Sequence, residues 1–327
     1  MQRLSFLKLA LCSALLATGL AAQAQVTKIR FAHAGPETAS QHQAALEFAR
    51  LVKERSKGML EVLVYPSSQL GNDSTVLGAV RGGTIDMMMA GSGNFSGLSS
   101  KFEVLDIPFL FRNPAHAYQA VDGEVGQGLM KSLDAHGLTQ LAFWEVGFRS
   151  ITTKNRPVRT PEDVKGLKIR TMPNPIHIQA WKMLGSNPVP MPLGELYGAL
   201  ESGAVDAQEH PVDITYASKF YEVQKHLTLT RHAFTAMPVV FSKRKFDALS
   251  PEMQKVVLSS AADAKAFQRN LNQKNEAGII AELKKNGMTV IETFDATAFK
   301  AVVGDEVRKT YATKNGPELL AAVDGLK

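Results

Sequence analysis

Apolar and polar positions in the first third of the chain switch repeatedly between a period of two, typical of strands, and a period near 3.6, typical of helices. The helix pattern that begins at Ser40 has a good capping residue there and a good stop signal at Gly58. The resulting β-α-β-α-β order predicts an α/β layer built on a largely parallel sheet. The predicted strands are residues 28–33, 60–65 and 85–90, and the predicted helices are 40–57 and 73–81.

A second run of the same kind begins after residue 160, with predicted strands at 167–171, 188–190 and 204–207 and predicted helices at 176–184 and 195–202. Two α/β units in one chain of 327 residues predict two lobes of similar build. Extended segments at 143–152 and 234–241 are interpreted as hinge strands between the lobes. The pattern at 251–286 predicts one long helix, and its only interior glycine, Gly278, marks a kink or a crossing between the lobes.

The first 24 residues have the pattern of a secretory signal peptide. Arg3 and Lys8 precede an uncharged apolar run at 9–22, and Ala22 and Ala24 supply the small-x-small cleavage pattern. An apolar run of 14 residues is too short to cross a hydrocarbon core about 30 Å thick, which argues against the alternative, an N-terminal anchor helix. We therefore expect residues 1–24 to be removed and the mature protein to be exported.

Composition and charge limit the classes of molecule that the protein is expected to bind. The chain has 37 Lys+Arg against 31 Asp+Glu, a formal net charge of +6 that falls to +4 without the two basic residues of the leader. No long run of Lys or Arg occurs, so we expect no nucleic-acid partner, whereas a weak positive charge suits small anions. The only cysteine, Cys12, lies in the leader, which excludes disulfides and cysteine-ligated metals from the mature chain.

Familiar catalytic and metal-binding motifs find no match. Gly91, Gly93 and Gly97 follow a strand pattern, but their spacing is one residue off the dinucleotide fingerprint, so we interpret them as a ligand-facing turn. G-x-S-x-G, H-E-x-x-H, P-loop and calcium-loop patterns do not occur, and the eight histidines lack metal-ligand spacing. The three methionines at 87–89 fit a buried strand better than a copper site. We expect neither a metal nor a cofactor.

Arg170 is the candidate anchor for an anion. It lies near the end of the predicted strand 167–171, which Pro173 terminates, and open α/β sheets bind ligands at the carboxyl edge of their strands. A guanidinium there offers a planar fork of donors that matches a carboxylate. Arg149, in a predicted hinge strand, is placed to face the same cleft. For each of the two, a surface arginine that pairs with an acidic side chain is the alternative.

Around these residues the chain resembles the solute-binding component of a tripartite ATP-independent periplasmic (TRAP) transporter of the DctP type. The resemblance covers essentially the whole mature chain. It implies an α/β two-lobe periplasmic-binding-protein clamshell with hinge strands and a long helix spanning both lobes. Lobe 1 would comprise 25–147 plus 236–276, and lobe 2 would comprise 148–235 plus 277–327. The segments that carry the resemblance are 65–71 (YPSSQLG), 82–86 (GGTID), 105–109 (LDIPF), 161–170 (PEDVKGLKIR) and 196–209 (LYGALESGAVDAQE).

The resemblance also implies a ligand and a site. The ligand would be an organic acid whose carboxylate meets Arg170, assisted by Arg149 and by the polar residue that follows Gln-Glu. In this chain that residue is His210, where many relatives carry Asn, and the change leaves a donor available. Capture without chemical conversion, followed by delivery to a sodium-driven TRAP membrane permease, is the implied mechanism, and we expect a monomer.

The opposite wall of the cleft indicates which acid is bound. By the same likeness it comes from the end of the first strand, the Gln-Leu-Gly loop and the turn after residue 89, and none of its residues is Lys or Arg. A C4-dicarboxylate would need a second cation for its far carboxylate, whereas acidic and amide groups suit hydroxyls. We therefore expect a polyhydroxy monoacid, a hexuronate such as glucuronate or galacturonate. The residues are His33, Glu37, Asn72, Asp73, Ser92 and Asn94, with Met172 beside Arg170.

Other interpretations stay open. The protein is alternatively a receptor for a C4-dicarboxylate or another organic acid, or a ligand sensor that presents to a membrane kinase. An exported uronate-processing enzyme, with His33 or His210 as general base, is a remote alternative. Trp144 is expected in the core, with stacking on a sugar face as the alternative role.

Overall fold

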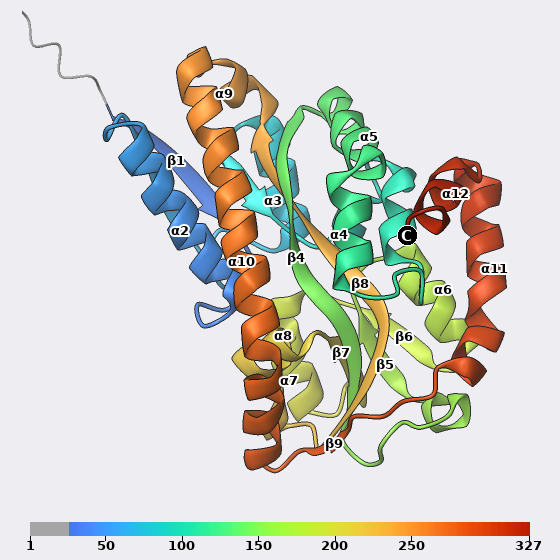
Figure 1. The fold of residues 1–327 in the computed structure, drawn as a ribbon. Coiled ribbons are helices and arrows are strands. Elements are labelled where there is room, and N and C mark those ends of the chain that lie inside the picture. Colours follow the sequence, from blue (N-terminus) through green and yellow to red (C-terminus); the bar gives the residue numbers. More distant parts are fainter. Residues whose placement is uncertain (1–25) are drawn as a thin grey trace, which may run out of the picture.

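The computed structural model describes residues 26–327, so the predicted signal peptide lies outside the described residues. Within this range one nine-stranded sheet has the order β2-β1-β3-β8-β4-β7-β5-β6, with β9 paired to β8 (Figure 1). The strands are β1 Thr27–Ala32, β2 Leu60–Tyr65, β3 Met87–Met89, β4 Leu138–Thr153, β5 Lys168–Thr171, β6 Asn187–Pro190, β7 Ala207–His210, β8 His226–Ser242 and β9 Thr289–Ile291. The α-helices are α2 Ser40–Arg55, α3 Asp73–Gly82, α4 Pro114–Asp122, α5 Glu124–Ser132, α6 Pro175–Met183, α7 Leu193–Glu201, α8 Val212–Ala217, α9 Lys243–Asp247, α10 Pro251–Lys285, α11 Thr297–Asn315 and α12 Glu318–Asp324.

One half of the sheet consists of β1, β2 and β3, which run parallel as the alternating pattern predicts. In its core Phe31 packs with Phe48 of α2 and Val257 of α10, and the three methionines of β3 are buried, which confirms the buried strand. Trp144 is fully buried in the same core and donates its Nε1–H to the carbonyl of Ala261 at 3.1 Å. It therefore fills the core, the expected role.

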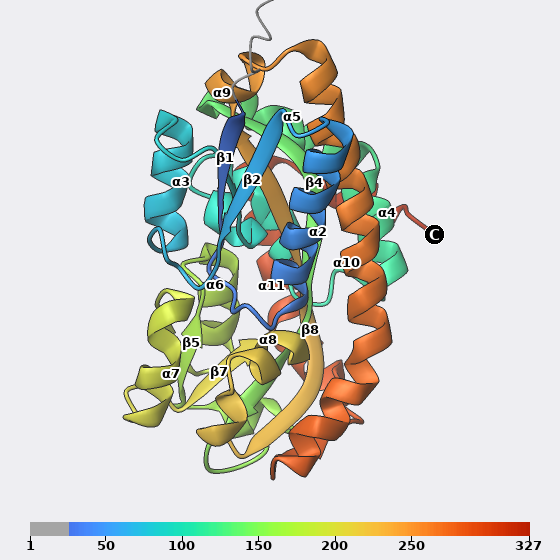
Figure 2. The ribbon, with the colours of Figure 1, turned by 90° about the vertical axis from the view of Figure 1, so that its left-hand side faces the viewer.

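The other half consists of β5, β6 and β7, also parallel, with α6, α7 and α8 around them (Figure 2). The strand predicted at 204–207 was wrong in position, because β7 begins at Ala207. Gly203 ends α7 in the left-handed conformation at φ 74°, and the N–H of Val205 still bonds back to the carbonyl of Ala199. The chain therefore completes a turn before it enters the sheet, and Glu209 and His210 fall inside the strand.

Two long antiparallel strands, β4 and β8, join the halves (Figure 1). They contain the predicted hinge segments but extend to 16 and 17 residues. Their pairing shifts register at three places, including the stretch between Glu145 and Gly147, where Gly147 has a φ of 114°. Such bulges bend and twist a strand locally, which lets β4 pass from one half to the other.

The predicted long helix is α10, which runs unbroken for 35 residues through Gly278 and lies along both halves (Figures 1 and 2). Gln268 of α10 fixes it to β4, because its amide accepts from the N–H of Glu145 at 3.0 Å and donates to the carbonyl of the same residue at 2.6 Å. Beyond it, α11 packs on α6, and α12 packs on α5. The lobe boundaries given above stay a prediction. Among residues 26–327, no helix has the length and apolar character needed to cross a membrane.

Candidate functional site

A cavity that opens to solvent lies between the two halves of the sheet, and its empty space, the open mouth included, is about 830 Å³. His33 reaches it from just after β1, Gly91 from just after β3, Arg170 from β5 and His210 from the end of β7. This is the carboxyl edge at which open α/β sheets bind ligands. Eight of the ten side chains predicted from the sequence line the cavity: Arg149, Arg170, Met172, His210, His33, Asn72, Asp73 and Asn94.

Arg170 is 3% exposed, and its hydrogen-bond partners are neutral. Its Nε and Nη2 donate to the carbonyl of Met191 at 3.0 and 2.6 Å, and its Nη1 lies 3.1 Å from Nε2 of His210. Burial, together with the nearby charge of Arg149, lowers the pKa of Arg170 to about 10, so it remains protonated at neutral pH. Within residues 26–327 no carboxylate forms an ion pair with it, although Asp73 is close enough to affect its pKa. The cavity therefore holds a buried positive charge without an ion-pair partner.

His210 holds Nη1 of Arg170 in place. Its Nδ1 bonds to Oε1 of Gln208, an acceptor, so Nδ1 carries the proton and Nε2 accepts from Arg170. Burial and the two nearby arginines hold the pKa of His210 well below its usual range, which keeps the ring neutral. The amide of Gln208 donates in turn to Oγ1 of Thr152 at 2.8 Å. The expectation that His210 has a donor available for the ligand was therefore wrong, because its one N–H already donates to Gln208.

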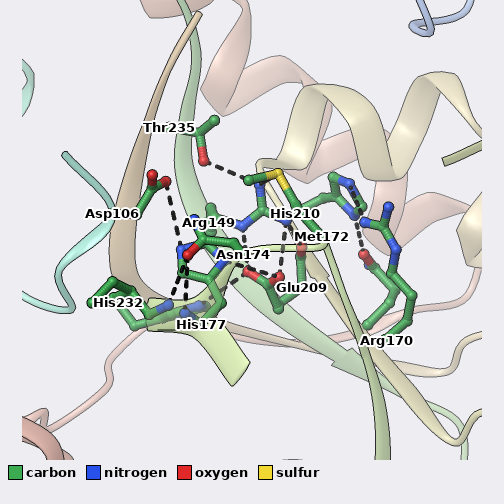
Figure 3. Close-up of polar contacts among 12 residues, drawn as sticks. Asp106, Arg149, Arg170, Met172, Asn174, His177, Glu209, His210, His232 and Thr235 are labelled. Atoms are coloured by element: carbon green, nitrogen blue, oxygen red, sulfur yellow. Dashed lines mark hydrogen bonds and ion pairs between the residues drawn. The ribbon is translucent and has the colours of Figure 1, made fainter. Parts of the chain in front are cut away.

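Arg149 has a different environment, because it is paired inside the protein (Figure 3). Its Nε and Nη2 bond to the carboxylate of Glu209, the latter at 2.9 Å, and its Nη1 donates to Oγ1 of Thr235 at 3.1 Å. Burial alone would raise the pKa of Glu209, but the charge of Arg149 and the hydrogen bond from His232 hold it well below the usual range. The Arg149–Glu209 pair is thus a neutral, buried unit, and Nη1 is the part of it nearest Met172 and the cavity.

Further buried polar side chains, among them Asp106 and His177, lie beside this pair (Figure 3). Asp106, from the 3-10 turn Ser100–Asp106, is fully buried and accepts from Oγ of Ser92 at 3.1 Å. Its Oδ1 lies 3.7 Å from Nε2 of His177, at the start of α6. Burial raises the pKa of Asp106 to about 7 and lowers that of His177 to about 3.

The opposite wall of the cavity is polar and carries one carboxylate. Asp73 accepts from Nδ2 of Asn94 at 3.4 Å, and burial raises its pKa to about 6, against the lowering effect of Arg170. Nε2 of His33 lies 3.1 Å from Nδ1 of His42, and burial together with His42 lowers the pKa of His33 to about 3. The Asp73 carboxylate, together with neutral amide and imidazole groups, therefore faces the arginines across the cavity.

Two of the predicted residues do not line the cavity. Glu37 is exposed and acts on the site only through its charge near His42. Ser92 is buried below the cavity, because its 3-10 turn directs the hydroxyl toward Asp106. The sequence analysis missed other polar lining residues: Gln41, Ser68, Ser74 and Thr235. Gln41 was detectable in principle, since it lies in the first turn of the helix that follows the first strand.

The described part of the chain contains no group of three His, Cys, Asp or Glu side chains arranged to hold a metal ion. Of the residues that line the cavity, Arg149 and Arg170 are the cations, and both lie on the same side. The arrangement provides one place for an anionic group and several places for hydroxyl groups.

Comparison with known proteins decides the family. The model named DctP, bacterial extracellular solute-binding protein, family 7, matches residues 31–314. The chain belongs to the DctP family. The 2,3-diketo-L-gulonate-binding periplasmic protein YiaO of Escherichia coli is 47% identical over 309 residues, which cover 94% of this chain and 93% of YiaO.

Solved structures agree with this family assignment. A TRAP periplasmic solute-binding protein from Polaromonas, bound to D-erythronate, superposes with a TM-score of 0.90 at 36% identity. The match covers 92% of this chain and 99% of the Polaromonas chain. One from Xanthobacter autotrophicus, with bound β-D-galacturonate, gives a TM-score of 0.87 at 29% identity, covering 91% and 100% of the two chains.

The family assignment fixes the general role of this DctP protein. It is a periplasmic solute-binding receptor of the TRAP type, it binds small organic acids, and it works with membrane permease components. Its relatives are receptors, so it is not an enzyme, and the remote alternative of an exported uronate-processing enzyme is set aside. The predicted family, fold class and compartment are confirmed.

Proposed function

We propose that this DctP protein captures a sugar acid with a single carboxylate, which Arg170 anchors in the cavity between the halves. The observation that carries the proposal is the environment of Arg170: a buried guanidinium with neutral hydrogen-bond partners and no carboxylate in ion-pair contact among residues 26–327. A buried charge without a counter-ion is costly, and a bound carboxylate supplies one. Arg149 assists through Nη1, while its other donors remain on Glu209.

The opposite wall argues for hydroxyl groups at the far end of the ligand. Asp73, Asn94 and Gln41 offer acceptors and donors there, and no Lys or Arg among residues 26–327 lines that side. A C4-dicarboxylate would bring its second carboxylate toward Asp73, and this like-charge contact disfavours it. A hydroxyl group, which both donates and accepts, suits the same position.

We propose a hexuronate, D-galacturonate or D-glucuronate, as the ligand, and the Xanthobacter relative with galacturonate supports this choice. An open-chain six-carbon acid, 2,3-diketo-L-gulonate, is the second candidate, because the protein named for that ligand is 47% identical over nearly the whole chain. Both acids have one carboxylate for Arg170 and several further oxygens for the polar opposite wall, which supports them as candidates. We further propose that the receptor is a monomer and delivers the acid to a sodium-coupled permease.

A thermal-shift screen of the refolded mature protein tests the proposal, with D-galacturonate, D-glucuronate, 2,3-diketo-L-gulonate, D-erythronate and succinate in the panel. A ligand at about a hundred times its dissociation constant stabilises the protein by about 2.7 kcal/mol, which a melting curve resolves. We expect a shift with a six-carbon sugar acid and none with succinate. A shift with succinate alone would overturn the monocarboxylate proposal, and a shift with diketogulonate but neither uronate would replace the hexuronate by the second candidate.

A further inference from the structure

We infer that Gly93 is a positioning residue for ligand capture: its missing side chain lets the turn after β3 seat against Asn174, so that the two halves close over the ligand. The inference rests on the proposed function, because it concerns how the same cavity closes. Gly93 lies in the 3-10 turn Ser92–Phe95 of the β1-β2-β3 half, and Asn174 precedes α6 in the other half. The two residues therefore meet across the cleft.

The contact leaves no room for a methyl group. A Cβ built on Gly93 would overlap the amide nitrogen of Asn174, and it would lie 3.0 Å from Cβ of Asn174 and 2.8 Å from Cε of Met172. Carbon atoms in favourable contact are about 3.5–4.0 Å apart, so at least one neighbour would have to move. The methyl end of Met172 is flexible and can turn away at little cost.

Asn174 cannot turn away so easily, because its side chain is the N-cap of α6. Its Oδ1 accepts from the N–H of Ile176 at 2.9 Å and from the N–H of His177 at 3.3 Å, and the residue is fully buried. Rotation of the amide would give up both cap bonds. With an alanine at position 93, the structure would relieve the overlap most easily by parting the two halves.

The overlap at position 93 exists only where the two halves touch, so it destabilises the closed state and leaves the open state unchanged. The φ of Gly93 is not in the left-handed region, so alanine is compatible with the local backbone. Closure of a two-lobe receptor is a hinge motion that the ligand favours through contacts made only in the closed state. A residue that obstructs closure therefore weakens binding without touching the ligand, and it does so mainly by faster dissociation.

Gly97 offers a matched control four residues along the same segment. A Cβ on Gly97 would have no atom within 4 Å, and its φ is likewise outside the left-handed region. The substitutions G93A and G97A remove a similar amount of backbone freedom from the unfolded chain. Any difference between the two variants therefore reports the contacts that a methyl group at position 93 makes with Asn174 and Met172.

The test compares dissociation constants of the wild type, G93A and G97A by calorimetry, with the acid of the panel above that the wild type binds most tightly. We expect G93A to bind roughly five- to hundredfold more weakly, the usual effect of overpacking by one methyl group, and G97A to bind within about twofold of the wild type. Melting of the ligand-free proteins should agree within a few degrees. Equal affinity of G93A and the wild type would overturn the inference.

A second variant identifies the partner. Asn174→Ser keeps a capping oxygen for α6 and removes the amide nitrogen that the methyl group of the G93A variant would overlap. The affinity loss caused by G93A should shrink in the N174S background, and an unchanged loss would contradict the assigned contact. The two proposals fail differently: a wrong ligand class shows as weak binding by the wild type, and a wrong role for Gly93 shows as equal binding by G93A and G97A.

Discussion

Replacing Arg170 with methionine separates what this residue does for binding from what it does for folding. Methionine has a similar length and carries neither a charge nor a strong donor. R170M removes a buried charge whose desolvation costs several kcal/mol, and it leaves the carbonyl of Met191 and Nε2 of His210 without a donor, at about 1–3 kcal/mol each. These effects oppose each other, so we expect the free energy of unfolding of the ligand-free protein to change by no more than about 2 kcal/mol.

Binding of the acid has no such compensation. In R170M the carboxylate of the acid would lie in the cavity without its cation, so the binding free energy should weaken by about 2–5 kcal/mol. This corresponds to a dissociation constant roughly 30- to 5,000-fold higher. Arg149 cannot take over the role, because Glu209 neutralises its charge and holds Nε and Nη2, which leaves Nη1 alone to assist. Arg170→Lys keeps the charge and loses the planar fork, so its affinity should fall between those of R170M and the wild type.

Calorimetric titration gives the affinities, and urea unfolding without ligand gives the stabilities. The proteins are refolded first, so that no bound acid is carried over. An R170M protein that binds within about twofold of the wild type would refute the assignment of the carboxylate to Arg170. A loss of several kcal/mol in unfolding free energy would refute the argument that this arginine serves binding at no net benefit to the fold.

Three further outcomes follow from the same contacts. R149M leaves Glu209 as a buried charge without its partner, so the unfolding free energy should fall by about 3–5 kcal/mol in urea melts, and a loss below about 1 kcal/mol would contradict the pairing. A bound carboxylate neutralises Arg170 and raises the pKa of Asp73 above its ligand-free value of about 6, so binding of the acid takes up a proton. The affinity should therefore fall as the pH rises from 6 to 8. In titrations at three pH values, D73N should flatten that profile. W144A should cost about 3–5 kcal/mol of stability, because the ring is fully buried, while the affinity of the folded protein stays within a few-fold.

Elements with a clear local pattern were predictable from the sequence. The helix expected at 40–57 is Ser40–Arg55, and the long helix expected at 251–286 is Pro251–Lys285, because apolar spacing acts within a few positions. The capping role expected for Ser40 was wrong: Ala39 is the N-cap, without a side-chain cap bond, and the Ser40 hydroxyl bonds instead to the carboxylate of Asp213. The hinge strands were predicted too short. The length of β4 and β8 depends on their pairing with each other across both halves, and a single-strand pattern does not contain that information.

The candidate site was predictable to the extent that topology determines it. Strand ends of an α/β sheet meet at one edge, so residues as distant as His33 and His210 were expected together, and both line the cavity. The direction of a side chain in a loop or a short turn was not predictable. Ser92 was expected in the cleft because of its neighbours in sequence, yet its hydroxyl turns down to Asp106, whose position depends on the packing of another turn.

The two arginines show why residue type alone leaves the chemistry open. Both are buried beside the same cavity, but the pairing of β4 with β7 sets Ile151 opposite Glu209, and this brings the Glu209 carboxylate to Arg149. On β5, Arg170 meets only a carbonyl and an imidazole, and the register that pairs it with Gln208 also places the amide that fixes the tautomer of His210. The same side chain thus becomes an internal ion pair on one strand and an available anion anchor on another. Strand register, which lies beyond local sequence, decides between the two roles.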